Sequence, residues 1–284
     1  MKRKFKLSKR AKIFVLCLFC IAIVFIGWNI FQNQHIEVNK ITIKSENLPD
    51  DFQGYKIVQV SDLHNAEFGK NNEDLLSLIE EQSPDIIVVT GDIVDSRRTN
   101  VQIARDFVNN ASEIAPVYYV TGNHEARVLA EDEIDNVELN KNIIVLHNKD
   151  ILLEKDESVI QLIGVDDPDY KAVKDSTKYM NKRLEKYCNN EYFKILLSHR
   201  PELFEIYAEN NMNIIFSGHA HGGQVRLPFI GGLIAPHQGL FPKYDAGVYT
   251  ENNTNMIVSC GLGDSIIPLR INNPPELVVV TLEK

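Results

Sequence analysis

Short apolar runs recur along the chain between polar segments, and most have the length and β-branched content of strands. Segments with apolar residues three or four positions apart indicate helices at Asn71–Gln82, Val101–Asn110 and Lys171–Tyr187, with another opened by Pro201. Strands are expected at Val38–Ser45, Lys56–Val60, Asp85–Thr90, Val117–Thr121, Asn142–His147, Ile151–Leu153, Val159–Val165, Lys194–Leu197, Ile214–Phe216, Asn255–Ser259 and Leu277–Leu282. This alternation predicts an α/β fold with a largely buried sheet.

Five of these apolar runs are followed at once by Asp, Asn or His: YKIVQVSDLH, IIVVTGD, VYYVTGNHE, KILLSH and IIFSGHAH. One polar residue at such a place is usually a turn former or a hydrogen-bonded structural residue. The repetition, which includes five of the eight histidines, instead predicts a single site, because ligands at the carboxyl ends of strands meet where an open α/β sheet binds its substrates. The candidate residues are Asp62, His64, Asp92, Asn123, His124, His199, His219 and His221.

The residue types in this set indicate a metal site. Asp, Asn and His without Cys suit Mn, Fe, Zn or Co better than a soft metal that prefers thiolates. Seven of the eight, all except His124, are too many for one tetrahedral ion and fit two divalent ions that share a carboxylate. Two ions about 3.5–4 Å apart clamp a phosphoryl group and lower the pKa of a bridging water, which gives a hydroxide nucleophile near neutral pH.

An uncharged apolar segment, Ile13–Phe31, follows a basic N-terminus. Its 19 residues would form a helix of roughly 28 Å, close to the apolar thickness of a bilayer. The seven basic residues before Ile13 favour a cytoplasmic N-terminus. We therefore expect a cytoplasmic tail (residues 1–12), a single-pass anchor in the cell membrane (13–31) and an extracytoplasmic catalytic domain (32–284).

A cleaved signal peptide and a buried soluble helix both fit the apolar segment less well than an anchor does. A cleaved signal peptide normally has a shorter apolar region and a small-x-small cleavage site, and FQNQHIEV offers none. A buried soluble helix would have a polar face, which this segment lacks. Outside the segment, Cys188 and Cys260 form either one disulfide or two buried thiols.

The charge of the chain narrows the class of partner. The formal net charge is −9, and the first twelve residues hold seven of the 30 basic side chains. The rest of the chain therefore has 23 basic against 39 acidic residues. Such an acidic body argues against nucleic acid as a partner, because nucleic-acid binding depends on Lys and Arg contacts to phosphate, although bound dications would change the local sign. The sequence leaves the oligomeric state open.

The strand-end residues form motifs that resemble those of the calcineurin-like metallophosphoesterase superfamily. The motifs are D-x-H at Asp62–His64, G-D at Gly91–Asp92, G-N-H-E at Gly122–Glu125, H at His199 and G-H-A-H at Gly218–His221, and they occur in the family's order. That family folds as a sandwich of two mixed β-sheets flanked by α-helices, which is therefore expected after one N-terminal transmembrane helix. GHAHGGQVRLP, the Tyr-x-x-Gly of Tyr244–Gly247 and the closing GLG…PLR…PPEL resemble one branch, the small bacterial phosphodiesterases with an N-terminal targeting or membrane segment.

The resemblance also implies roles for the motif residues. One ion would be held by Asp62, His64 and His221, the second by Asn123, His199 and His219, with Asp92 bridging both. His124 would stabilise the transition state and, as general acid, protonate the leaving oxygen. Glu125 would either orient His124 or be an exposed turn acid. Purple acid phosphatases in this superfamily have a Tyr three residues after the bridging Asp; this chain has Asp95 there, so a tyrosinate–iron site is not expected.

The sequence says less about the substrate. Leu227–Pro242 is apolar and rich in Gly and Pro, and it is either a lip that admits a lipid-linked phosphodiester or a pair of buried loops. His237 lies in this segment without an evident partner. Three arginines near the motifs could hold a phosphate oxygen, although surface ion pairs are their more ordinary role: Arg97, Arg200 and Arg226.

Two classes of function follow from these residues. The complete set of motif residues favours a membrane-anchored phosphodiesterase over a non-catalytic metal-binding ectodomain, which would be expected to have lost a ligand or His124. Within the enzymes, a phosphomonoesterase, a protein phosphatase or a nuclease is the lesser alternative. The expected cofactors are two divalent ions, Mn, Fe or Zn.

Overall fold

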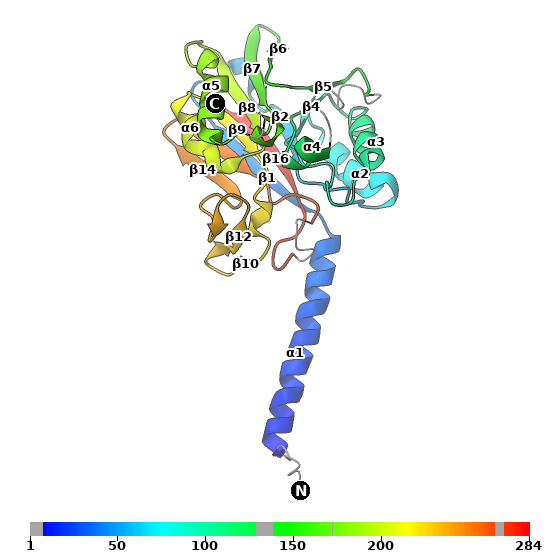
Figure 1. Cartoon of the computed structure of the whole chain (residues 1–284). Helices are drawn as coiled ribbons and strands as arrows, with labels where there is room; N and C mark the ends of the chain where they lie inside the picture. Colours follow the sequence, from blue (N-terminus) through cyan, green and yellow to red (C-terminus); the bar gives the residue numbers. More distant parts are fainter. Residues whose placement is uncertain (1–7, 129–138, 172, 265–269) are drawn as a thin grey trace.

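Two six-stranded β-sheets pack face to face, with helices on both outer sides (Figure 1). The computed structural model describes residues 8–128, 139–171, 173–264 and 270–284. The first sheet has the order β1 (Glu37–Lys44), β16 (Glu276–Glu283), β2 (Lys56–Val60), β3 (Ile86–Val89), β4 (Val117–Tyr119) and β5 (Ile143–Val145). The second has the order β14 (Gly247–Glu251), β15 (Thr254–Val258), β9 (Ile214–Ser217), β8 (Phe193–Ser198), β7 (Ser158–Val165) and β6 (Asp150–Lys155). Both sheets mix parallel and antiparallel pairs, so the predicted sandwich of mixed sheets is confirmed.

The remaining elements cover the sheets and connect them. α2 (Glu73–Gln82) and α3 (Val101–Ala111) pack on the first sheet, and α5 (Ser176–Leu184) and α6 (Phe204–Glu209) pack on the second. α4 (Asn123–Val128) follows β4. Two short hairpins join β10 (Arg226–Leu227) to β11 (Gly231–Gly232) and β12 (Ile234–Ala235) to β13 (Gly239–Leu240). Single 3₁₀ turns are η1 (Asp50–Phe52), η2 (Lys70–Asn72), η3 (Pro168–Lys171), η4 (Glu185–Tyr187), η5 (Pro201–Leu203) and η6 (His221–Gly223).

The apolar pattern of the strands explains the layers. Successive side chains of a strand point to opposite faces. In β2, Ile57 therefore lies in the core between the sheets with Phe216, whereas Val58 lies in the outer core with Leu75 of α2. Because both faces of β2 are buried, a shift of one residue would exchange its two apolar sets, so the register of β2 is strongly specified. A fixed register of a strand also fixes where the loop that follows it begins.

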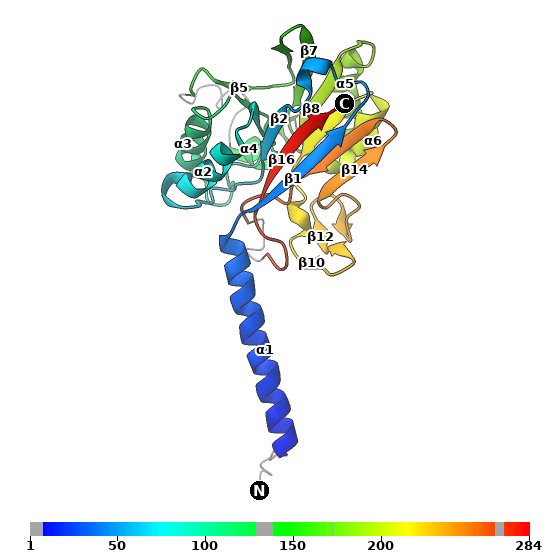
Figure 2. The same cartoon turned by 180° about the vertical axis from the view of Figure 1, so that it is seen from behind.

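Strand direction places the ends of β2, β3 and β4 on the side of the molecule where α1 (Lys9–Gln34) joins it. β1 follows α1 and runs parallel to β16. β2 is antiparallel to β16, and β3, β4 and β5 are parallel to β2. Figure 2 shows β1 and β16 running away from α1. The loops that follow β2, β3 and β4 therefore lie at the α1 side of the first sheet.

Most predicted elements are present, with shifts where local geometry differs from the apolar pattern. The helix expected from Asn71 begins at Glu73, because Asn71 and Asn72 have φ of 54° and 63°. The helix expected from Lys171 begins at Ser176, where the Asp175 side chain accepts from the Lys178 N–H as an N-cap. β14 was not predicted, and the two hairpins were missed because paired segments of two residues have no readable periodicity.

α1 is longer than the predicted apolar span. Among the described residues it is the one helix long and apolar enough to cross a membrane, with a mean hydropathy of 2.7 over its most apolar window. It continues to Gln34, and β1 begins at Glu37, so only His35 and Ile36 separate the helix from the first strand. Residues 1–7 of the expected basic tail lie outside the described residues. Cys188 and Cys260 are free thiols in this structure.

Candidate metal centre

The eight candidate side chains converge at the edge where both sheets end. Asp62 and His64 follow β2, and Asp92 follows β3. Asn123 and His124 open α4 directly after β4. The others follow strands of the second sheet: His199 follows β8, and His219 and His221 follow β9. All eight are buried, so water competes little for the atoms that they direct at one another.

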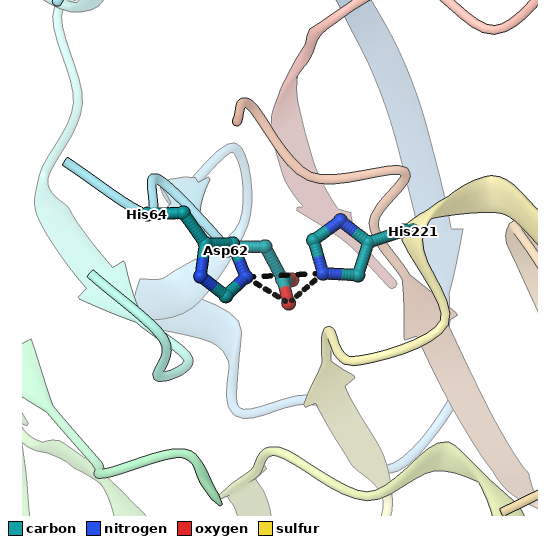
Figure 3. A group of neighbouring side chains, drawn as sticks. All are labelled: Asp62, His64 and His221. Atoms are coloured by element: carbon teal, nitrogen blue, oxygen red, sulfur yellow. Dashed lines mark hydrogen bonds and ion pairs between the residues drawn. The ribbon is translucent and has the colours of Figure 1, made fainter. Parts of the chain in front are cut away.

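The first cluster contains Asp62, His64 and His221 (Figure 3). His64 Nε2 and His221 Nε2 lie 3.1 Å apart. Asp62 Oδ1 is 3.2 Å from His221 Nε2 and 3.9 Å from His64 Nε2. Three potential ligand atoms thus surround one point, as a cation site requires.

The second cluster contains Asp92, Asn123, His199 and His219. His199 Nε2 is 3.2 Å from Asp92 Oδ2 and 3.1 Å from His219 Nδ1. His199 Nδ1 donates to the Thr90 carbonyl at 2.7 Å, so Nδ1 carries a proton and Nε2 is the nitrogen directed at the cluster. An amide atom of Asn123 is 2.8 Å from His219 Nδ1. If that atom is the amide oxygen, its lone pair faces the lone pair of His219 Nδ1, and a cation would bind both. If the amide is rotated, its NH₂ group donates a hydrogen bond to His219 Nδ1 instead.

Asp92 lies between the two clusters. Its Oδ2 is 3.2 Å from His199 Nε2 in the second cluster and 3.7 Å from His64 Nε2 in the first. Its Oδ1 accepts from the His124 backbone N–H at 2.7 Å. One carboxylate oxygen is therefore within reach of both groups of histidines.

The electrostatics of the clusters fit divalent cations. Burial raises the pKa of Asp62 to about 7, with Asp92 adding to the rise and His199 opposing it. Burial also lowers the pKa of His64 to about 3, and that of His221 well below its usual range, so both imidazoles are neutral, the form that binds metal. Burial alone would lower the pKa of His199, but Asp92 outweighs it and raises the pKa to about 10. A dication at this position would stabilise both carboxylates and displace the His199 Nε2 proton.

Unpartnered ring nitrogens complete the test of fit. His64 Nδ1 and His221 Nδ1 are buried without a hydrogen-bond partner, while the Nε2 atoms of both rings point at each other. Because both rings are neutral and direct Nε2 at the same point, both Nε2 atoms are available to a shared ion, and the residues present fit a metal.

The backbone at the site is strained. Five candidate ligands have φ in the left-handed region: Asp62 (52°), His64 (47°), Asp92 (53°), His219 (67°) and His221 (48°). Such conformations persist where surrounding structure enforces them, and they concentrate at functional sites. Gly122 permits one of these turns, because a Cβ there would lie 2.3 Å from Asp92 Oδ1.

Glu125 has a role that neither sequence-based alternative described. It is fully buried, so it is not an exposed turn acid. Its Oε2 accepts from the N–H groups of Asp92 and Gly122, both at 2.8 Å, and its Oε1 accepts from Val94 N–H at 3.0 Å. These three donors belong to the backbone and not to the His124 ring, so the Glu125 carboxylate holds the loop that carries Asp92.

His124 stands beside the first cluster. Its ring meets that of His64 edge-on at 4.4 Å between centroids. The Ser96 backbone N–H donates to His124 Nδ1 at 3.0 Å, so Nδ1 is an acceptor and the proton of the neutral ring is on Nε2. Burial lowers the pKa of His124, although Asp92 opposes this.

Two contacts of the second cluster were not predicted. His237, at the turn of the second hairpin, places Nδ1 2.8 Å from His219 Nε2, with the rings stacked at 5.0 Å. Arg200 is buried rather than on the surface; its Nη2 donates to Asp167 Oδ1 at 2.6 Å, and its Nη1 lies 2.7 Å from His237 Nδ1. His237 is 16 residues from His221 in sequence, and no motif connected it to the site.

The other two arginines form partly exposed ion pairs, as their more ordinary role implies. Arg97 Nε donates to Asp95 Oδ1 at 2.8 Å, and Arg226 Nη1 donates to Asp245 Oδ2 at 3.0 Å.

Arg127, which no sequence motif singled out, lies closer to the site. With the Asn123 amide rotated, Arg127 Nη1 donates to its oxygen at 3.1 Å.

The sequence model of the calcineurin-like phosphoesterases matches residues 55–223, which include every candidate ligand. The chain belongs to the calcineurin-like phosphoesterase family. The metallophosphoesterase YkuE of Bacillus subtilis is 33% identical over 259 residues, with 87% of this chain and 86% of YkuE covered. The phosphodiesterase YaeI of Escherichia coli is 26% identical over 82% of this chain and 84% of its own length. A zebrafish (Danio rerio) "transmembrane protein with metallophosphoesterase domain" is 26% identical over 95% of this chain, which spans 62% of that protein.

Family membership identifies the phosphoesterase as a metal-dependent phosphoric ester hydrolase. Its relatives include a protein described as transmembrane, which fits the apolar α1 and membrane association. The family typically binds two divalent metals, and the Asp and His clusters at the strand ends provide groups that could hold them.

Proposed function

We propose that the phosphoesterase hydrolyses a phosphodiester with two divalent ions, Mn, Fe or Zn, held at the strand ends. The observation that carries this proposal is Asp92 Oδ2, which lies within 3.7 Å of ring nitrogens from both clusters. The first ion would be held by Asp62, His64 and His221, the second by Asn123, His199 and His219, and both by Asp92. The two ions, when bound, supply an activated water and a clamp for phosphoryl oxygens.

The protein's own groups then position the substrate and stabilise charge. His124 offers its Nε2 proton to the phosphoryl or leaving oxygen. Full transfer of a proton, the general-acid role, requires a second proton on Nδ1, where Ser96 N–H now donates. In the present arrangement, His124 can therefore donate a hydrogen bond from Nε2. To act as a general acid, the ring must first lose the hydrogen bond from Ser96 N–H and take up a proton on Nδ1. Arg127, beside Asn123 and about half exposed, is placed to contact a phosphate oxygen.

A diester is the favoured substrate class. The name of YaeI, which resembles this chain over most of its length, describes a phosphodiesterase. All seven candidate ligands and His124 are present, which argues for a working enzyme rather than a metal-binding ectodomain without activity. The phosphomonoesterase alternative remains an outcome of the test below.

We also propose that α1 anchors the enzyme with its N-terminus in the cytoplasm and the catalytic domain outside the membrane. The register of the first sheet supports a metal centre near the proposed anchor. β1 begins at Glu37, which pairs with Glu276 of β16. β2, whose end leads into Asp62, is the next strand on the other side of β16. Two strand spacings amount to about 10 Å. A site this near the anchor would work close to the bilayer surface, which favours a lipid-linked or envelope-linked phosphodiester.

The activity is tested with purified full-length protein, prepared without chelator and assayed on aryl phosphodiesters and aryl phosphomonoesters. We expect metal-dependent hydrolysis that is faster on the diesters and is abolished by chelation and restored by Mn, Fe or Zn. Faster hydrolysis of monoesters would support the phosphomonoesterase alternative. No hydrolysis of either class by metal-loaded protein would support a non-catalytic ectodomain.

The orientation is tested separately by treating intact cells with protease and mapping the fragments. We expect the region after Gln34 to be digested and the mature N-terminus to lie at or near Met1. Protection of the catalytic domain would place it inside the cell, and an N-terminus near residue 31 would show that the segment is a cleaved signal.

A further inference from the structure

The two short hairpins of residues 226–241, called here the apolar hairpins, expose large apolar side chains. Outside α1, the four most exposed large apolar side chains among the described residues are Phe229 (109%), Leu240 (67%), Ile230 (64%) and Phe241 (58%). Residues 227–242 contain no Asp, Glu, Lys or Arg. A cluster of this kind on a protein surface normally marks contact with another protein, a ligand or a membrane.

The apolar hairpins lie at the α1 side of the domain, as both views show (Figures 1 and 2). The last turns of α1 are attached to the same side. Asn33 Nδ2 donates to the Arg270 carbonyl at 3.0 Å, and Asn272 N–H donates to Asn29 Oδ1 at 3.3 Å. Asn29 is buried, unlike the other described side chains along the apolar part of the helix. These contacts hold α1 in one direction relative to the domain.

The segment that receives α1 also supports the metal centre. Asn273 Nδ2 donates to the His221 carbonyl at 2.8 Å. Arg270 Nη1 donates to the Gly263 carbonyl at 2.7 Å, and Gly263 N–H donates to the Asp62 carbonyl at 2.7 Å. The end of α1, Asp62 and His221 are therefore linked through one hydrogen-bond network, which is part-buried at α1 and buried at Asp62 and His221.

The apolar hairpins are fixed to the same ligand loop. Gly223 of η6 lies so close to Gly232 that a Cβ on Gly223 would be 2.3 Å from the Gly232 Cα. Arg226 Nη1 donates to the Gly222 carbonyl at 3.0 Å and pairs with Asp245. His237 contacts His219 at 2.8 Å. The segment with the exposed apolar tips is thus joined to the metal centre by direct contacts.

We propose that the apolar hairpins insert into the outer interface of the bilayer that α1 spans, as a second membrane contact beside the metal centre. This inference rests on the proposed anchor. Continuity with the anchor selects the bilayer as the occupant, because the hairpins share its side of the domain and carry no acidic residue that an anionic membrane would repel. With α1 and the hairpins both engaged, the metal centre is held near the lipid headgroups.

The test uses tryptophan quenching in vesicles. Trp28, in α1, is the only tryptophan of the chain. Full-length protein is reconstituted into phosphatidylcholine–phosphatidylglycerol vesicles, with or without bromine on the upper acyl chains. Three variants carry Trp28→Phe together with Phe229→Trp, Leu240→Trp or Tyr192→Trp. Tyr192 is the matched control, because it is exposed and precedes β8, at the opposite end from His199.

We expect brominated lipid to reduce the emission of Trp28 in the wild type, and of Phe229→Trp and Leu240→Trp, by about twofold or more, and to leave Tyr192→Trp unchanged. Quenching of Trp28 without quenching at positions 229 and 240 would overturn the second contact and leave the anchor intact. An unquenched Trp28 would overturn the anchor itself. Quenching at position 192 equal to that at 229 would mean that no particular face meets the lipid.

Discussion

The metal centre and the apolar hairpins lie at the same end of the two sheets, yet their side chains have opposite exposure. At the metal centre, polar side chains such as Asp62 and His199 are completely buried. In the hairpins, Phe229 is completely exposed. The first arrangement is costly without compensating charge, and the second is costly in water. Each is explained by a partner outside the chain: cations for the buried polar groups and, as we propose, lipid for the exposed apolar ones.

The two regions also differ in how they are held. The ligand loops are held by backbone contacts to the strands and to the Glu125 carboxylate. The hairpins have strands of only two residues and are held by the close approach of Gly223 and Gly232 and by the Arg226–Asp245 pair. Substitutions at the metal centre should therefore abolish the chemistry, whereas substitutions at the hairpin tips should change only how lipid substrates are reached.

The largest effect is expected for Asp92→Ala, because one oxygen of Asp92 lies near both histidine clusters. Elemental analysis should give about two ions per wild-type chain, almost none for Asp92→Ala and about one for His64→Ala. The rate should fall by at least the roughly 10²–10³-fold that accompanies loss of one electrostatic stabiliser. Asp95→Ala removes a carboxylate of the same loop and should keep both ions. Two ions in Asp92→Ala would refute the bridge.

The next effect is expected for His124→Ala, which should keep both ions but lose about 10²–10⁴-fold in rate. The loss should be smaller for nitrophenyl esters than for alkyl esters, because a good leaving group needs less stabilisation of its oxygen. Rates on both ester series measure this difference. His147→Ala, which alters a histidine paired with Asp166, is the control and should leave both rates unchanged. An unchanged rate of His124→Ala on alkyl esters would remove the assigned role.

A smaller effect is expected on stability from Glu125→Gln. Its carboxylate accepts three backbone N–H groups, and an amide NH₂ in place of one oxygen would face donors. Thermal unfolding of the metal-free protein should show a loss of about 1–3 kcal/mol. Glu80→Gln, on the exposed face of α2, should change nothing. Equal melting temperatures for the two variants would mean that Glu125 does not hold the loop.

The smallest effect is expected at the hairpins. Phe229→Ser combined with Leu240→Ser should lower the rate on a lipid phosphodiester in vesicles by roughly three- to tenfold, because the proposed anchor α1 would still hold the protein at the membrane. The rate on a water-soluble aryl diester should not change. Tyr192→Ser is the matched control at the opposite end of the second sheet. If both rates fall together, the hairpins support the fold; if neither falls, they do not deliver lipid.

Much of this picture could be predicted from the sequence. Strands such as β2 and β3 have long apolar runs whose ends carry the motif residues, so both the fold and the candidate residues were readable. The function of Glu125 was not, because its partners are backbone N–H groups that sequence does not display. His237 was missed for a related reason: its contact with His219 depends on the close packing of Gly223 on Gly232. Pairing of strands as short as β10 and β11 depends on such packing rather than on periodicity.

The central claim is that a pair of ions is held at the strand ends by seven of the eight converging residues, with His124 beside them. Anomalous diffraction from crystals of the metal-loaded enzyme tests it most directly. We predict two anomalous peaks about 3.5–4 Å apart, with Asp92 between them and His124 beside them without ligating either. A single peak, or a pair of peaks that Asp92 does not bridge, would contradict the account.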